Sequence, residues 1–185
     1  ATIPPLSPRI AFRDITNRTN RRTTIASVVP PEIFLTHKAP YLLKIRGDSM
    51  DEAFLLGLLS SIPLDWYARR FVETNLTFFI LNSFPIPRPA RSNLLWQRVV
   101  KISGRLASVD ERLSNWLSEI GVDYGPLDPQ IKEDKIFELD AVVAHLYGLS
   151  ETQLVHIFET FHEGWNYEAR LNEVLKHYHA WAGKA

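Results

Sequence analysis

The chain has 185 residues, of which 45% are hydrophobic and 23% are charged, and it contains no cysteine. This composition is typical of a globular protein with a real core, so it excludes bulk disorder, and the lack of cysteine excludes disulfides and Cys-based zinc sites. The formal net charge is zero, but residues 1–105 hold fifteen Lys+Arg against seven Asp+Glu, a net of +8, and residues 106–185 hold six against fourteen, a net of −8.

This charge split has two interpretations. It indicates a polyanionic partner for the basic half, or two halves that pack together and neutralise each other. No apolar run approaches the roughly 18 residues that span a bilayer, so we expect no membrane contact and, with no cysteine, a cytoplasmic location. The sequence opens on ATIPPLSPR, without an initiating Met or a signal-peptide pattern, so we expect a piece of a longer protein.

Four short segments of the first half are predicted strands. Residues 9–14 alternate apolar and polar side chains, and residues 23–29 are rich in β-branched residues and end at Pro30. Residues 41–46 (YLLKIR) are a third candidate and residues 76–81 (LTFFIL) a buried fourth. Together they predict a small mixed sheet.

Helical patterns occupy the rest of the chain. Asp51 is a candidate N-cap for a helix whose apolar residues recur at three- and four-residue spacing, and Pro63 should kink that helix or split it in two. After Pro89 the pattern stays helical to the end. Apolar stripes predict helices over residues 95–106, 109–120, 136–146, 150–161 and 167–181.

These elements predict an α+β fold, in which a small mixed sheet with a packed helix precedes an all-helical part. We place the boundary near residue 90. Residues 1–90 then form a basic α/β part, and residues 91–185 form an acidic helical part.

Signatures of catalysis are missing from the chain. It contains no Gly-rich phosphate loop, no G-x-S-x-G elbow and no H-E-x-x-H motif, so we predict no catalytic residue and no metal ligand. Glu133-x-Lys135, with Asp128 upstream, has the spacing found in metal-dependent nucleases. That chemistry needs the pair on a strand, whereas here the pair opens a helix, on which positions two apart diverge.

The strongest functional candidate is the stretch Thr16-Asn17-Arg18-Thr19-Asn20-Arg21-Arg22, between the first two predicted strands. It offers three guanidiniums and two amides, with no carboxylate among them. Guanidiniums form bidentate hydrogen bonds with phosphate and with guanine, and Asn can do the same with adenine. We therefore predict a DNA contact here. The alternative is a solvated hairpin loop whose arginines pair with the acidic half.

Further candidates for DNA contact are basic and amide residues elsewhere in the first half: Arg13, Lys38, Arg69, Arg70 and Asn75. The alternative is that these residues do not contact DNA and only supply positive charge at the ends of helices and strands. The aromatic residues do not suggest a stacking platform for single strands, because most of them lie on apolar helical faces. The predicted core tryptophans are Trp66, Trp96, Trp116 and Trp165.

Three segments together carry a resemblance to a known family. They are IAFRDITNRTNRRTTIASVVP, then LLGLLSSIPLDWYARRFVETNLTFFILNSFPIPRP, and then FELDAVVAHLYGLSETQLVHIFETF. They resemble successive blocks of the target-recognition region in bacterial adenine-N6 DNA methyltransferases of restriction-modification systems. In that family an R-x-I-x-x-x-T-N-x-R-T-x-I-A stretch is typical. The resemblance runs from about Arg9 to Phe161.

The resemblance implies a TaqI-like specificity domain that docks on duplex DNA and serves an upstream catalytic methyltransferase domain. The family's catalytic Asn/Asp/Ser-Pro-Pro-aromatic motif is not matched by Val29-Pro30-Pro31-Glu32 or by Ile3-Pro4-Pro5-Leu6. The glycine-containing cofactor loop is missing too. No cofactor is therefore assigned to this chain, and S-adenosylmethionine is implied only for the parent protein, whether or not that protein also carries an endonuclease.

Two functional hypotheses follow. In the first, the chain is the DNA-binding specificity fragment of such a methyltransferase and reads duplex DNA with its Arg/Asn-rich turn. In the second, it is a protein-interaction or scaffold domain whose acidic helices bind a partner subunit or the catalytic domain.

Overall fold

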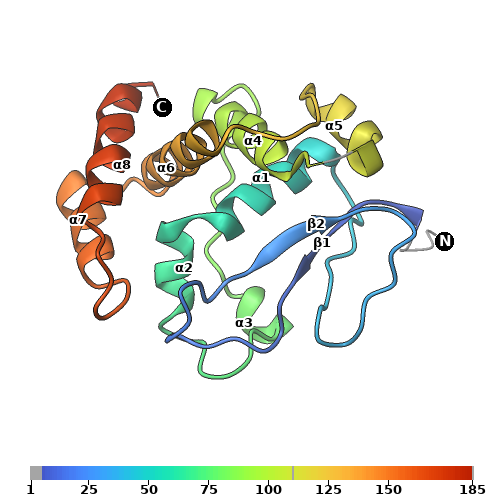
Figure 1. Ribbon diagram of the computed structural model, residues 1–185, viewed down its shortest axis with the longest axis horizontal. Coiled ribbons are helices and arrows are strands. Elements are labelled where there is room, and N and C mark those ends of the chain that lie inside the picture. Colours follow the sequence, from blue (N-terminus) through green and yellow to red (C-terminus); the bar gives the residue numbers. More distant parts are fainter. Residues whose placement is uncertain (1–5, 110, 185) are drawn as a thin grey trace.

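The computed structural model describes residues 6–109 and 111–184. Within these residues, eight α-helices and one antiparallel pair of strands form an α+β fold, which confirms the predicted fold class. Figure 1 shows α7 and α8 at one end of the molecule and the two strands towards the other, with α1 and α4 between them.

The sheet contains only two strands, β1 (Arg9–Phe12) and β2 (Ala26–Val29), which confirms the first two predicted strands in shorter form. They pair antiparallel with Arg9 opposite Val29 and Phe12 opposite Ala26. All four β1 residues are buried, because the strand lies between β2, α1 and the segment that follows Pro40.

The predicted strand over residues 41–46 is wrong. Tyr41 forms only an isolated bridge with Ala11, and the Leu42 N–H donates to the Ile10 carbonyl at 2.8 Å. The chain then leaves the sheet and approaches α1, where the Lys44 ammonium contacts the Glu52 carboxylate at 2.7 Å. Leu43 and Ile45 therefore stay exposed, and only Tyr41 and Leu42 of this segment are partly buried.

The predicted strand over residues 76–81 is also wrong. Leu76 donates to the Asp14 carbonyl at 2.8 Å, but the chain then forms the short helix α3 (Phe78–Leu81). The Thr77 hydroxyl accepts a hydrogen bond from the Ile80 N–H and so caps this helix. The local cap favours a helix here, and the helix buries Leu81 while it leaves Phe78 and Phe79 exposed.

The central helix is split as Pro63 predicts, into α1 (Ser49–Ser60) and α2 (Ile62–Ala68). The N-cap of α1 is Asp48 and not Asp51 as predicted. Asp51 instead closes a capping box with Asp48, because it occupies the third helical position, from which its carboxylate can accept the Asp48 N–H.

The second half is helical throughout, as predicted. Its helices are joined by capped turns: the Asp128 carboxylate caps α6, and Ser150 forms a capping box with Gln153 at the start of α7. The elements are α4 (Leu94–Ala107), the 3-10 turn η2 (Glu111–Leu113), α5 (Ser114–Ile120), α6 (Pro129–Leu146), α7 (Glu151–Glu159) and α8 (Glu168–Trp181).

The apolar core is continuous between the parts of the chain before and after residue 90. One apolar cluster includes Ile10 of β1, Leu58 of α1, Ile102 of α4 and Val142 of α6. At the contact of α1 with α4, a Cβ on Gly57 would lie 2.2 Å from the Ser103 Oγ, so the close helix approach requires glycine. The division into two domains stays a prediction, but the two parts share one core.

A second apolar cluster joins α2 to α6, α7 and α8. Ile62 packs there with Leu154, Phe158 and Val174. None of the helices in residues 6–109 and 111–184 combines the length and the apolar character that a bilayer span requires.

Candidate nucleic-acid interface

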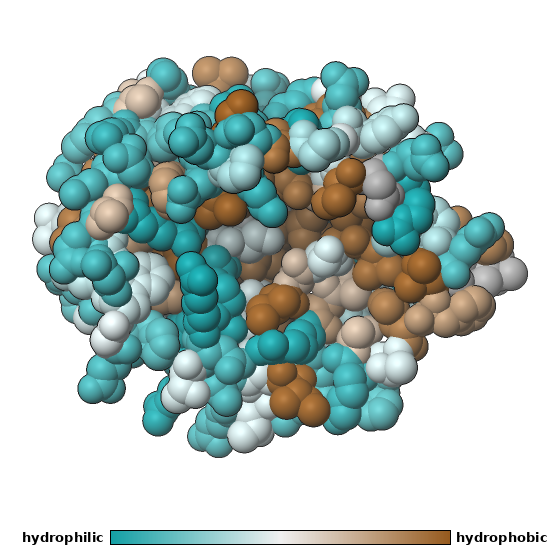
Figure 2. Space-filling model, viewed as in Figure 1, coloured by the Kyte–Doolittle hydropathy of each residue, from teal (hydrophilic) through white to brown (hydrophobic). Residues whose placement is uncertain are grey.

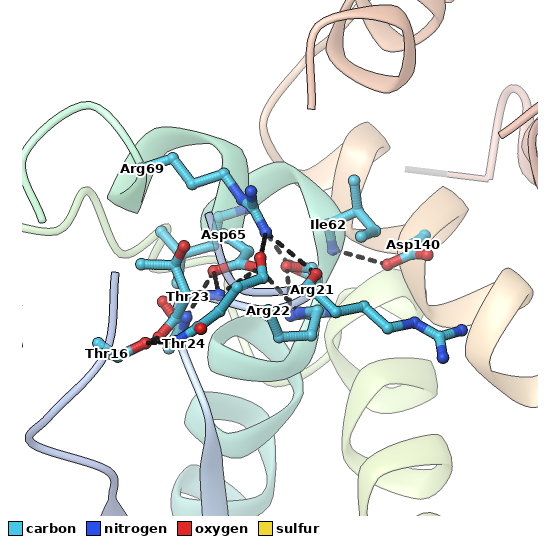
Figure 3. A network of polar contacts seen from close by, with 12 residues as sticks. Thr16, Arg21, Arg22, Thr23, Thr24, Ile62, Asp65, Arg69 and Asp140 are labelled. Atoms are coloured by element: carbon cyan, nitrogen blue, oxygen red, sulfur yellow. Dashed lines mark hydrogen bonds and ion pairs between the residues drawn. The ribbon is translucent and has the colours of Figure 1, made fainter. Parts of the chain in front are cut away.

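The candidate site is the loop of residues 16–22 between β1 and β2, called here the arginine-rich loop. Its two ends are held together, because the Thr16 hydroxyl donates to the Thr23 carbonyl at 2.7 Å and the Thr23 hydroxyl donates to the Asn17 carbonyl at 3.1 Å. The loop lies against α2, which supplies two charged side chains beneath it (Figure 3).

The first of these side chains is Asp65, whose carboxylate is fully buried. It accepts the Thr23 N–H at 3.1 Å and the Thr24 N–H at 2.6 Å, and it forms an ion pair with the Arg22 Nε at 2.8 Å. Arg22 also donates to the Ser61 carbonyl at 3.1 Å. Arg22, a predicted DNA contact, is thus engaged in holding the loop to α2.

The second is Arg69, one turn further along and 6% exposed. Its guanidinium donates to the carbonyls of Arg18, Asn20 and Arg21, at 2.6, 2.7 and 3.0 Å. Burial lowers the pKa of this guanidinium, and the nearby Asp65 carboxylate opposes that shift. The predicted DNA contact Arg69 therefore lies under the loop, where its two terminal nitrogens already have partners.

Arg69 also connects the loop to the helical half. Its guanidinium carbon lies 3.9 Å from the centre of the Phe161 ring, just beyond the end of α7. A cation over an aromatic face is attracted by the negative face of the ring, most strongly where water is excluded. The shape of the arginine-rich loop is therefore coupled to the position of α7.

The two asparagines of the loop are partly used by the loop itself. The Asn17 Oδ1 accepts the Thr19 N–H and the Asn20 N–H, both at 3.0 Å, which makes a local Asx turn. The Asn20 amide lies beside the Thr16 hydroxyl, and its oxygen can accept from Arg13 at 2.6 Å. Both asparagines are half-buried, so they present less to a ligand than the sequence suggested.

Arg18 and Arg21 point outwards. Both are exposed, and neither side chain has a hydrogen bond or ion pair with any described residue. In Figure 3, Arg21 leaves the loop on the side of Asp140. Arg13 is exposed beside them and donates to the Thr16 hydroxyl, at 3.3 Å, and to the Asn20 amide oxygen. These three guanidiniums form the basic surface of the site.

The remaining predicted contacts lie around this surface. Lys38 is 3.6 Å from the Asp14 carboxylate, and Asn75 donates to the same carboxylate at 3.1 Å. Arg70 is exposed, with its guanidinium carbon 4.5 Å from the centre of the Trp66 ring. Asp14 thus offsets part of the positive charge on this side of the loop.

A second buried carboxylate, Asp140 of α6, supports the base of α2. It is fully buried and accepts the Ile62 N–H at 2.7 Å (Figure 3). It also pairs with the Arg170 guanidinium at 2.6 Å. The sequence analysis identified neither Asp65 nor Asp140. The available signal was an aspartate inside an apolar run, IPLDWY or FELDAVV, because a charge there is buried only with a partner.

The acidic helices also use their charge internally. Glu138 of α6 accepts two hydrogen bonds from Arg98 of α4, and its Oε1 accepts from the Trp181 Nε1 at 3.0 Å. Burial opposes ionisation of Glu138, but the Arg98 hydrogen bonds and charge hold its pKa below the ordinary value. Among the described residues, no ion pair joins the arginine-rich loop to the helices of residues 106–185.

Residues 6–109 and 111–184 contain no group of three or more His, Cys, Asp or Glu that could hold a metal ion. Glu133 and Lys135 lie in the first turns of α6, behind its N-cap Asp128. Comparisons with protein-family models, with curated proteins and with solved structures found no match to this chain.

Proposed function

We propose that this chain binds duplex DNA through the arginine-rich loop, as the target-recognition part of an adenine-N6 DNA methyltransferase of restriction-modification systems. The methyl transfer and its S-adenosylmethionine belong to a catalytic domain outside these residues. The DNA contact is supported by the geometry of the loop, and the methyltransferase assignment by the resemblance of the three sequence blocks.

The main observation behind this proposal is that the basic residues have two different roles, because some hold the loop backbone and others have unused donors. Asp65 and Arg69 hold the loop backbone, so Arg18 and Arg21 are presented on a fixed frame with their donors unused. A frame that is ordered before binding loses less entropy on binding than a mobile loop does. In this proposal Arg18, Arg21 and Arg13 meet phosphate or guanine, while Arg22 and Arg69 serve as positioning residues.

The test is a salt titration of binding to a fluorescently labelled duplex. Each phosphate contact contributes about −0.9 to the slope of log K against log salt. We expect Arg18→Ala and Arg21→Ala each to weaken binding and to reduce that slope by about one.

A matched control is Arg46→Ala. Arg46 is exposed and precedes α1, so the length of that helix, about 18 Å, separates it from the end that carries the arginine-rich loop. We expect the slope of this variant to equal that of the wild type. Binding that ignores salt, or equal effects of all three variants, contradicts the proposal.

A protein-binding role is the second candidate, and the acidic helices favour it. Some carboxylates of this half are paired within the fold, but many others are exposed, namely Glu133, Glu151, Glu159, Glu163 and Glu168. Figure 2 shows hydrophilic residues over this end of the molecule. A DNA-free pull-down with the upstream catalytic region tests this role, and a stoichiometric complex made through residues 106–185 supports it.

A further inference from the structure

A wide groove separates the arginine-rich loop from the helical half. It has a volume of about 1030 Å³ and runs between the loop, α6, α8 and the turn that precedes α8. Arg21 of the loop forms part of one wall, while Lys132 of α6 and Trp165 of the turn line other parts. Its size is at the upper end of the range for sites that take small organic ligands.

Several polar groups of this groove lack partners among the described residues. The Trp165 Nε1 is buried without a hydrogen bond, although an indole N–H is normally paired when it is buried. The side chains of Arg21, Lys132 and Asn166 are exposed and have no hydrogen bond or ion pair with a described residue. The groove therefore combines an unused buried donor with unused cations and an unused amide.

Trp165 also differs from the core residue that its sequence position predicts. Its ring packs against Phe161, at a centroid distance of 4.9 Å, and against Phe158, at 5.8 Å, yet the side chain is only half-buried and lines the groove. Phe161 is the ring over which Arg69 lies. Phe161 therefore contacts both Trp165, which lines the groove, and Arg69, which holds the arginine-rich loop.

The charges of the groove narrow the class of ligand. Arg21 and Lys132 suit a phosphate, but the exposed carboxylate of Glu133 lines the same groove and disfavours a ligand that is anionic throughout. A nucleotide carries one phosphate, a flat aromatic base and, in three of the four DNA bases, an exocyclic amino donor. Carboxylates accept from such amino groups, and aromatic rings stack on any base.

We propose that this groove binds one unpaired nucleotide of the DNA that the arginine-rich loop contacts. Its phosphate lies between Arg21 and Lys132, and its base stacks on the exposed part of the Trp165 ring, with the Asn166 amide as the donor to the base edge. The inference rests on the proposed function for its partner, DNA. The nucleotide must be unpaired, because a base inside a duplex cannot present its face to a side chain.

The experiment compares two labelled duplexes, one fully paired and one identical except for a single bulged nucleotide. Stacking of a base on an aromatic ring gives an expected preference for the bulged duplex of about fivefold to 150-fold. Trp165→Leu should abolish this preference while leaving the affinity for the paired duplex unchanged, and a thermal melt checks that the variant is folded.

Two lysine variants on α6 test the groove without removing an aromatic side chain that the fold uses. Lys132→Ala should reduce the preference for the bulged duplex, whereas Lys135→Ala, on the same helix but outside the groove lining, should not. Equal wild-type affinities for the two duplexes overturn this inference and leave the proposed function standing. Failure to bind either duplex overturns both.

Discussion

The arginine-rich loop and the segment of residues 30–46 both leave the same small sheet, but their environments differ. The loop is polar, yet Asp65 and Arg69 beneath it are buried and bind its amides and carbonyls. The segment is richer in apolar side chains, yet Phe34 is 83% exposed and Ile45 is 89% exposed. Figure 2 shows apolar residues gathered at the end of the molecule away from α7 and α8.

This comparison shows that buried charged side chains, rather than apolar content, fix the backbone of the irregular segments. A buried carboxylate without partners is costly, so Asp65 strongly favours the backbone conformation that brings it two N–H groups and a guanidinium. In the segment of residues 30–46 the same role falls to Arg9 of β1, which is 3% exposed, donates to the Ile33 carbonyl and lies with its guanidinium carbon 4.8 Å from the centre of the Tyr41 ring.

Asp65→Ala tests most directly whether Asp65 anchors the arginine-rich loop. The substitution leaves the Arg22 guanidinium and the Thr23 and Thr24 amides without their acceptor, so we expect a loss of about 3–5 kcal/mol in the free energy of unfolding. Chemical denaturation measures this loss. Asp123→Ala, at an exposed position in the α5–α6 connection, is the matched control and should cost under about 0.5 kcal/mol. Equal losses would show that Asp65 is no anchor.

Arg69→Lys tests the other anchor. Lysine keeps the charge but cannot reach three carbonyls with a planar fork, so we expect a loss of about 1.5–3 kcal/mol together with weaker DNA binding. Hydrogen exchange of the Thr23 and Thr24 amides should accelerate, because local opening becomes easier. The neighbouring, exposed Arg70→Lys is the control, and matching exchange rates in the two variants would refute the anchoring role.

Glu138→Gln tests whether the ion pair of Arg98 with Glu138, between α4 and α6, stabilises the fold as Asp65 and Arg69 do. The folded-state pKa of Glu138 is depressed, so its stabilisation is fully present above the ordinary glutamate pKa and is lost as the pH falls through the depressed value. We expect the wild type to be more stable than the variant by about 1–3 kcal/mol near pH 7, and this difference to shrink as the pH falls below the ordinary glutamate pKa.

Denaturation curves recorded across this pH range measure the difference. Glu133→Gln changes an exposed carboxylate on the same helix and is the control, for which we expect almost no difference at any pH. A Glu138→Gln difference that stays constant with pH would mean that ionisation of Glu138 does not contribute.

Ile45→Ser should have the smallest effect. The side chain is exposed, so its removal should change the free energy of unfolding by less than about 0.5 kcal/mol. Ile10→Ala in β1 removes a buried side chain instead and should cost about 2–5 kcal/mol. A large loss from Ile45→Ser in a denaturation curve would show that residues 30–46 are packed in solution.

Local chemistry made much of the fold predictable. Pro63 divides α1 from α2, Ser150 and Gln153 open α7, and the apolar stripes place the C-terminal helices, because caps, prolines and helical periodicity act within a few residues. Residues 41–46 and 76–81 were mistaken for strands because their apolar content was real, but the pairing beside them ends at the isolated bridges of Tyr41 with Ala11 and of Asn75 with Ile15.

The sequence by itself determined the helices other than α3, the first strand pair and the donor-rich loop between its strands. Only the tertiary structure decided which arginines of that loop are free, because Asp65 and Arg69 follow it by more than forty residues and their roles depend on how α2 packs. The same packing brings Trp165, Lys132 and Arg21 together in the lining of one groove. Such pairings are set by three-dimensional burial of charge, which no local pattern of residues encodes.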